Sequence, residues 1–168
     1  MSGPIDAIAS AIWFILPAYF ANAAPLVLGG GPPLDMGNKF SDGRRIFGDG
    51  KTTRGFVGGL IVGTIIGLLQ GIFQAPLGEH LLLGFMLALG ALLGDLVSSF
   101  IKRRLGIERG GAAPGLDQLS FVVVALILAS PVKVPSWQVI AILLIITPPI
   151  HLATNFVGYK LGLKSRPY

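Results

Sequence analysis

The chain has 168 residues, of which 52% are apolar and only 12% are charged, and its mean hydropathy is +0.74. Soluble domains are about 25% charged, so this composition excludes an ordinary soluble domain and favours a protein embedded in lipid. The absence of cysteine excludes disulfides and thiolate metal sites. A net charge of +5 suggests nucleic-acid binding in a soluble protein, but here the charges flank apolar segments, and we expect no nucleic-acid partner.

Five apolar segments have the length of membrane-crossing helices, which is roughly 17–25 residues. They are residues 7–28, 56–73, 81–101, 116–132 and 137–157. Because lipid offers the backbone no hydrogen-bond partners, all five should be α-helical. We therefore expect an all-α integral membrane protein whose residues 1–168 form one transmembrane catalytic domain. Glycines at spacings of about four in the second segment predict a face for close helix packing; they are Gly58, Gly59, Gly63 and Gly67.

The basic residues predict how the chain is oriented. Twelve of the thirteen lysines and arginines lie in residues 29–55, in residues 102–115 or after residue 157, and Lys133 is the exception. If all five segments cross, these three regions share one side. The positive-inside rule then predicts two long cytoplasmic loops, a cytoplasmic C-terminus and an outside N-terminus. We expect a multi-pass protein of the cell membrane with its active site facing the cytoplasm.

The third apolar segment ends with a polar stripe. Asp95, Ser98, Ser99 and Lys102 follow an i, i+3, i+4, i+7 pattern and therefore share one helix face. Asp95 lies seven residues before Lys102, which is about 10 Å inside the membrane boundary at 1.5 Å per residue. A carboxylate at that depth needs a partner. One interpretation is a structural ion pair, either with Lys102 or between helices, and the other is a functional site.

A second carboxylate follows a flexible loop. Residues 106–115 are rich in glycine, so their backbone can approach a ligand closely. Asp117 then stands at the start of the fourth segment, where it could simply cap a helix. Together, Asp95 and Asp117 suit a Mg²⁺–triphosphate, because Mg²⁺ takes one or two carboxylates and completes its shell with phosphate oxygens and water.

The first long loop mixes glycines, cations and acids. Its candidates for binding phosphates are Arg44, Lys51, Thr52 and Arg54. Possible additional site residues are Asn22, Asn38, Asp42 and Asp49. A plain basic loop would only bind anionic lipid, but the interspersed acids argue against that alternative.

Several of these motifs resemble the signature of the phosphatidate cytidylyltransferase (CDP-diacylglycerol synthase) family. The matching residues are Gly94-Asp95, Ser99-Phe100-Ile101-Lys102-Arg103, Pro114-Gly115, Asp117 and the run from Gly48 to Gly55. The chain is most similar to the short archaeal branch. It departs from the bacterial signature, because His-Gly-Gly is missing before Asp117 and Gln118-Leu119-Ser120 replaces an arginine and a second aspartate.

The resemblance implies a reaction between CTP and 2,3-di-O-geranylgeranylglyceryl phosphate that gives a CDP-activated lipid and pyrophosphate. It implies CTP, an isoprenoid ether lipid phosphate and membrane lipid as partners, and Mg²⁺ held by Asp95 and Asp117. Asp95, Lys102 and Asp117 would be catalytic. The implied nucleotide- and phosphate-binding residues are Lys51, Thr52, Arg54, Arg44, Ser98, Ser99, Arg103 and Gly115.

Two other functions compete with this one. A CTP-dependent polyprenol kinase would need a base to deprotonate an alcohol. The two histidines are His80, on the outer side, and His151, midway along the fifth segment, where a helix–helix hydrogen bond is the favoured role. A small non-enzymatic transporter would need a polar path through the bilayer, whereas the ionisable residues cluster at one end.

Overall fold

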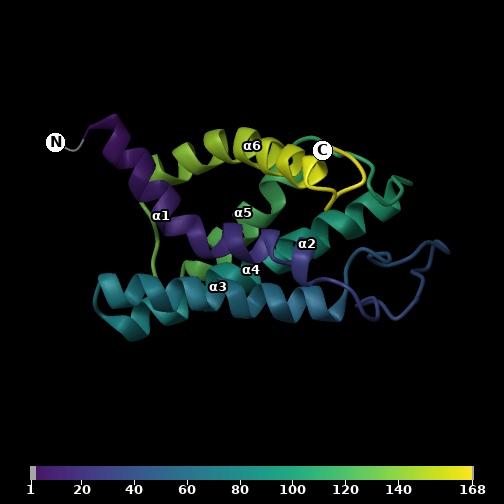
Figure 1. The fold of residues 1–168 in the computed structure, drawn as a ribbon, viewed down its shortest axis with the longest axis horizontal. Coiled ribbons are helices and arrows are strands. Elements are labelled where there is room, and N and C mark those ends of the chain that lie inside the picture. The colour runs from purple at the N-terminus through teal and green to yellow at the C-terminus, as the bar shows by residue number, and fades with distance from the viewer. Residues whose placement is uncertain (1–2, 168) are drawn as a thin grey trace.

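The computed structural model describes residues 3–167, and its elements are all helices (Figure 1). They are α1 (Pro4–Ala23), α2 (Pro25–Leu28), α3 (Thr53–Phe73), α4 (Leu77–Arg104), α5 (Leu116–Ala129) and α6 (Trp137–Lys160). The prediction of an all-α fold is confirmed. The first predicted segment is divided into α1 and α2 at Ala24, directly before Pro25, whose ring removes a backbone donor.

Within residues 3–167, four helical segments have the length and hydropathy to cross a membrane: Pro4–Leu28, Thr53–Phe73, Leu77–Arg104 and Trp137–Lys160. The fifth helix, α5, has only 14 residues, or about 21 Å at 1.5 Å per residue. Its two ends nevertheless lie at opposite ends of α4. Asp117 at its start pairs with Lys102, and Lys133 in the turn after it lies 3.7 Å from Glu79. The helix and its following turn thus run the length of the bundle.

The central helix is α4, which packs against α1, α3 and α5, whereas α6 packs against α1 and α5. Glycines allow the closest approaches. A Cβ at Gly67 would lie 2.5 Å from Gly84 of α4, and one at Gly94 would lie 2.5 Å from the Ser120 carbonyl oxygen of α5. Gly59 and Gly63 also pack against α1 and α4, as the glycine spacing predicts, while Gly58 faces Leu28 instead.

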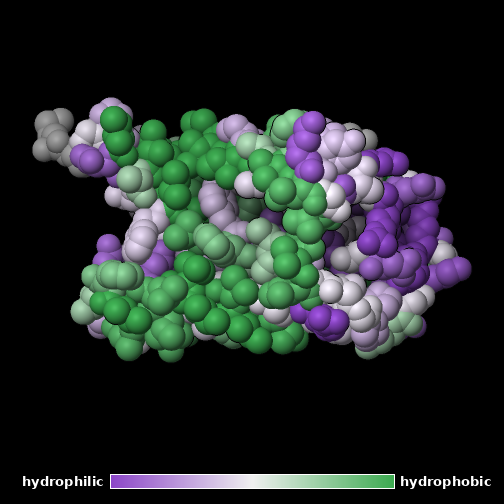
Figure 2. All heavy atoms as spheres, viewed as in Figure 1, coloured by the Kyte–Doolittle hydropathy of each residue, from purple (hydrophilic) through white to green (hydrophobic). Residues whose placement is uncertain are grey.

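Apolar and polar surfaces are separated along the bundle. Figure 2 shows an apolar surface over the helices and a polar surface gathered at the end that carries the first loop. Exposed apolar side chains such as Ile61, Ile65 and Ile72 cover the outer face of α3, where lipid would meet them. Buried Ile15, Leu87, Val122 and Leu143 form the core from α1, α4, α5 and α6. The candidate site lies at the polar end.

Candidate active site

The first loop, residues 29–52, is organised by a buried carboxylate. Asp35 accepts hydrogen bonds from the Arg45 guanidinium and from the backbone N–H groups of Gly37, Phe47 and Gly48. Burial alone would raise the pKa of the Asp35 carboxyl, but these hydrogen bonds hold it well below its usual range. Asp35 is thus an ionised anchor around which the loop folds, and its polar partners are all in the loop itself.

Lys51, at the end of this loop, reaches the central helix. Its Nζ lies 2.5 Å from Asp95 Oδ2, and both side chains remain about one-quarter to one-third exposed, at 27% and 30%. Thr52 follows as the N-cap of α3, where its hydroxyl accepts a hydrogen bond from the Gly55 N–H. The cap therefore fixes where α3 begins and holds Lys51 against α4. A cavity of about 30 Å³ adjoins this pair, between the start of α3 and α4.

A second pair lies at the junction of α4 and α5. Lys102 Nζ donates to both Asp117 carboxylate oxygens at 2.9 Å, and the Ser98 hydroxyl donates to Oδ1 at 3.1 Å. The Ala113 N–H donates to Oδ2 at 2.8 Å and ties the second loop to the same carboxylate. Asp95, Ser98 and Lys102 occupy successive turns of one face of α4, as their spacing predicts. Asp95 pairs with Lys51 of the first loop and Lys102 pairs with Asp117 of α5, so each ion pair joins α4 to another element. The structural alternative of an Asp95–Lys102 pair is therefore not found.

Arginines dock the first loop onto the end of α4. Arg44 Nη1 donates to the backbone oxygens of Arg103 and Arg104, and Arg104 lies 3.0 Å from Asp42. Asp49 accepts from Arg45 at 2.6 Å. These contacts give Arg44, Asp42 and Asp49 a role in holding the loop.

Arg103 lies beside the loop without such a contact. Its Nη1 lies 3.5 Å from the Cβ position of Gly48, and within the described residues its buried Nε has no hydrogen-bond partner.

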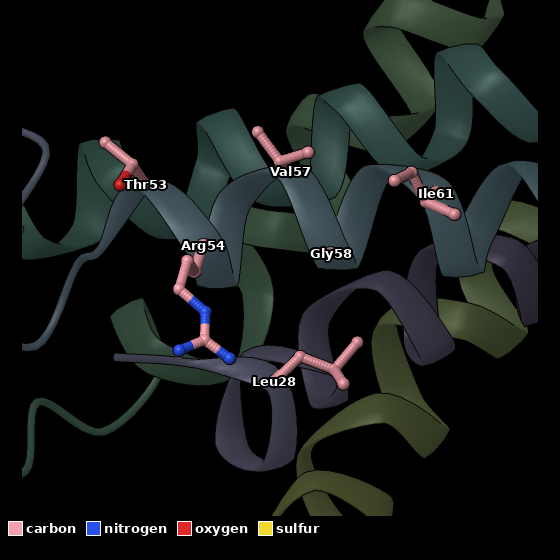
Figure 3. A pocket seen from close by; sticks show the side chains of 6 residues that line it. All are labelled: Leu28, Thr53, Arg54, Val57, Gly58 and Ile61. Carbon is pink, nitrogen blue, oxygen red and sulfur yellow. The ribbon is translucent and has the colours of Figure 1, made fainter. Parts of the chain in front are cut away.

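Arg54 lies apart from the two pairs. Figure 3 shows its side chain at a pocket between α2 and α3, lined by Leu28, Thr53, Arg54, Val57, Gly58 and Ile61. The pocket has a volume of about 430 Å³ and opens toward the apolar surface. Arg54 remains a predicted phosphate-binding residue, placed at this pocket.

The remaining predicted residues occupy varied positions. Ser99 is half-buried on α4, next in sequence to the Ser98 that contacts Asp117. Gly115 has a φ of 80° directly before α5, a conformation that favours glycine, and its N–H donates to Gln118. Asn22 is half-buried on α1, and Asn38 is exposed in the first loop.

The donor set fits Mg²⁺ only when a ligand supplies further oxygens. Within residues 3–167, no three His, Cys, Asp or Glu side chains gather closely enough to form a metal site on their own. Asp95 and Asp117 instead offer two partly exposed carboxylates, each balanced by a lysine. This is the sparse protein contribution that is typical of Mg²⁺ bound together with phosphates.

Three residues from the C-terminal part of the chain also belong to the polar end, although they lie outside the sequence motifs. His151 Nδ1 lies 3.2 Å from Asn155 Nδ2, and Lys164 Nζ donates to Asn155 Oδ1 at 2.5 Å. The partner of His151 is on its own helix, so the predicted helix–helix hydrogen bond is replaced by an i, i+4 contact. The four-residue spacing of Thr147, His151 and Asn155 was the available sequence signal.

Comparisons with known proteins agree with this architecture. The family model described as CarS-like, CDP-archaeol synthase, matches residues 5–168. CDP-archaeol synthase of Thermococcus gammatolerans is 53% identical, over 99% of each chain. The Pyrococcus horikoshii CDP-archaeol synthase is 54% identical over 94% of this chain and 95% of its own. A solved structure described as an intramembrane enzyme for archaeal membrane lipids biosynthesis superposes with a TM-score of 0.81 and 42% identity, over 88% of this chain and 94% of that chain.

Proposed function

The chain belongs to the CDP-archaeol synthase family, and we propose that it transfers CMP from CTP to an archaeal lipid phosphate, 2,3-di-O-geranylgeranylglyceryl phosphate. A phosphate oxygen of the lipid attacks the α-phosphorus of CTP. The new P–O bond forms as the bond from the α-phosphorus to the oxygen that bridges it to the β-phosphorus breaks. The products are CDP-archaeol in its unsaturated form and pyrophosphate. The lipid phosphate is already an anion, so the attack needs no general base.

The observation that carries this proposal is the gathering of the two ion pairs at one end of an apolar bundle. Lys51–Asp95 and Lys102–Asp117 bring together first-loop, α4 and α5 residues where the apolar surface gives way to the polar one. A lipid phosphate needs such a border, because its chains stay in the bilayer while its headgroup meets a soluble nucleotide. Phosphoryl transfer depends mostly on positioning and on electrostatic stabilisation, and charged side chains at this border supply both.

Lys51, Lys102 and Arg103 are the proposed phosphate-binding residues around this centre. A lysine paired with a carboxylate can shift its hydrogen bonds to a phosphate oxygen at little cost, because both acceptors are anionic. Arg103 brings a guanidinium whose buried Nε has no hydrogen-bond partner within the described residues. Ser98 and Ser99 add hydroxyls on the same turn of α4.

Asp95 and Asp117 are the proposed Mg²⁺ ligands. A bound Mg²⁺ would neutralise phosphate charge and favour departure of pyrophosphate. The protein contributes the position of the two carboxylates. Thr52 caps α3 behind Lys51, while Ser98 and the Ala113 N–H orient Asp117.

We further propose that five segments cross the membrane, as one domain, with the polar end in the cytoplasm and the N-terminus outside. Twelve of the thirteen lysines and arginines support this orientation. CTP would then enter the site from the cytoplasm, and the acceptor would enter from the inner leaflet.

The test is pyrophosphate release by the purified protein in detergent with CTP, Mg²⁺ and digeranylgeranylglyceryl phosphate. Parallel reactions replace CTP with ATP, or the lipid phosphate with a polyprenol. We expect release only with CTP and the lipid phosphate, together with a CDP-lipid product by mass spectrometry. Formation of CDP with the polyprenol, without pyrophosphate, would identify a kinase and overturn the proposal.

A further inference from the structure

The inner face of α6 carries a row of polar side chains that ends at the polar end of the bundle. Thr147, His151 and Asn155 are spaced four residues apart, so they lie along one face of the helix. Thr147 is buried, and its hydroxyl forms a hydrogen bond of 2.7 Å with the Tyr19 hydroxyl of α1. Asn155 is only 8% exposed. The His151 ring lies against Phe121 of α5, with 6.0 Å between ring centroids. The row therefore faces the inside of the bundle.

The segment after α6 folds back over this row. The N–H groups of Leu163 and Lys164 both donate to the Gly158 carbonyl oxygen, and Gly162 turns the chain with a φ of 72°. Because Gly158 has no side chain, the Lys164 stem lies over it, with Cγ 3.7 Å from the Cβ position. This fold-back brings Lys164 Nζ to within 2.5 Å of Asn155 Oδ1.

The folded-back segment lies beside the residues proposed for catalysis. Arg166 contacts the second loop at Gly110, and that loop donates the Ala113 N–H to Asp117. Burial lowers the pKa of Lys164, and the positive charge of Lys51 lowers it further, while Asp117 and Asp95 oppose the shift. Lys164 thus shares the electrostatic surroundings of both ion pairs.

Lys164 differs from Lys51 and Lys102 in its partner. Those two lysines contact carboxylates. Within the described residues, the side chain that contacts Lys164 Nζ is the neutral amide of Asn155. A half-buried ammonium whose side-chain partner is a neutral amide is costly, and an anion bound at this position would relieve that cost.

The surroundings indicate which anion it is. Leu152 and Phe156, adjacent in sequence to His151 and Asn155, are 47% and 50% exposed on the outside of α6. The Cβ position of Gly158 lies 3.1 Å from Leu26 of α2, another exposed apolar residue. An anion at Lys164 therefore has apolar surface next to it, which suits a phosphate attached to isoprenoid chains better than a free nucleotide.

We propose that Lys164 binds the phosphate of the lipid acceptor, with Asn155 as the residue that positions its ammonium group. The inference rests on the proposed function and adds to it a separate phosphate-binding position for the acceptor, on the segment that follows α6. The acceptor phosphate would be held from the α6 side, while the CTP phosphates are held by Lys51, Lys102 and Arg103.

The experiment measures steady-state kinetics while the lipid phosphate and CTP are varied independently. Lys164→Gln should raise the KM for the lipid phosphate at least about tenfold, equivalent to about 1.4 kcal/mol, and leave the KM for CTP within about twofold of that of the unmodified protein. Lys164→Arg, which keeps the charge, should restore most of the lipid affinity. Lys160→Gln is the matched control, because it removes an exposed lysine at the same end of α6 that lies over Phe156.

A second variant guards against misfolding. Asn155→Asp places a carboxylate beside Lys164 without removing the lysine. Unlike Asp95 and Asp117, this carboxylate is not a proposed Mg²⁺ ligand, so its negative charge should repel the lipid phosphate and raise its KM. A rise in the KM for CTP alone, or unchanged lipid kinetics in both variants, would overturn the inference while leaving the proposed function intact. If the unmodified protein releases no pyrophosphate from CTP, the proposed function itself is overturned.

Discussion

Lys51 Nζ contacts Asp95 Oδ2 at 2.5 Å, so the residue that precedes the N-cap of α3 is joined to a carboxylate on the central helix α4. The contact fixes the end of the first loop against the bundle. It also holds a cation and an anion together at the boundary of the apolar surface, where a charged substrate would meet them. Removing either partner leaves the other as a partly buried charge with no opposite charge beside it, so the two residues should be tested together.

Asp95→Asn and Lys51→Met should each lower kcat of pyrophosphate release by about 10²–10³-fold, because each removes a charge placed to stabilise the transferring phosphates. The double variant should be scarcely worse than either single variant, since both act in one unit. Glu79→Gln is the control, because Glu79 pairs with Lys133 at the opposite end of the bundle. Near-normal kcat in Asp95→Asn would remove that carboxylate from the site.

Asp117→Asn should lose activity to a similar extent while the protein still inserts and purifies. The amide keeps the shape of the side chain and one acceptor, but it loses the charge that faces Lys102 Nζ at 2.9 Å. Ser98→Ala removes a single hydrogen bond to the same carboxylate and should cost only about 0.5–1.5 kcal/mol of transition-state stabilisation. If Asp117→Asn and Ser98→Ala were equally mild, Asp117 would be only a helix cap.

Asp35→Asn should destabilise the first loop by about 1–3 kcal/mol, because it leaves Arg45 and three backbone donors facing a neutral amide. The folded-state pKa of Asp35 lies below the unfolded value of about 3.9. Its stabilisation is therefore fully present above about pH 5 and is lost as the pH falls through the lower folded-state pKa. Limited proteolysis of the loop checks this, and the difference between the two proteins should be constant from pH 8 to pH 5. A difference that changes across that range would contradict the ionised anchor.

The sequence predicts the helical bundle and its polar end well, because apolar length and charge asymmetry are local properties. It also places Asp95, Ser98 and Lys102 on one face by helical spacing alone. It does not predict that Asp95 pairs with Lys51, 44 residues away, since that contact depends on how the first loop folds around Asp35. The sequence does not place Lys164 in the site for the same reason. Its position depends on a turn at Gly162 that no periodic pattern predicts.

Gly94→Ala should separate α4 from α5, because the added Cβ would lie 2.5 Å from the Ser120 carbonyl oxygen. Overpacking of this kind costs about 1–3 kcal/mol, and here it should also move Asp117 away from Ser98 and Lys102 and lower activity. Gly78→Ala, on the same helix with no atom within 4 Å of the added Cβ, is the control, because it brings the same helix propensity without the clash and should lower neither stability nor activity. Thermal unfolding in detergent and pyrophosphate release measure the two effects. Equal behaviour of the two variants would contradict the close contact of α4 and α5.

The proposed orientation is tested by single cysteines, since the chain has none of its own. Ser41→Cys lies in the exposed first loop, and Val134→Cys lies in the connection between α5 and α6, where Val134 is 70% exposed. A membrane-impermeant maleimide applied to intact cells should label Val134→Cys and should label Ser41→Cys only after permeabilisation. Labelling of Ser41→Cys alone would reverse the orientation. Protection of both cysteines until permeabilisation would mean that α5, with its 14 residues, does not cross the membrane.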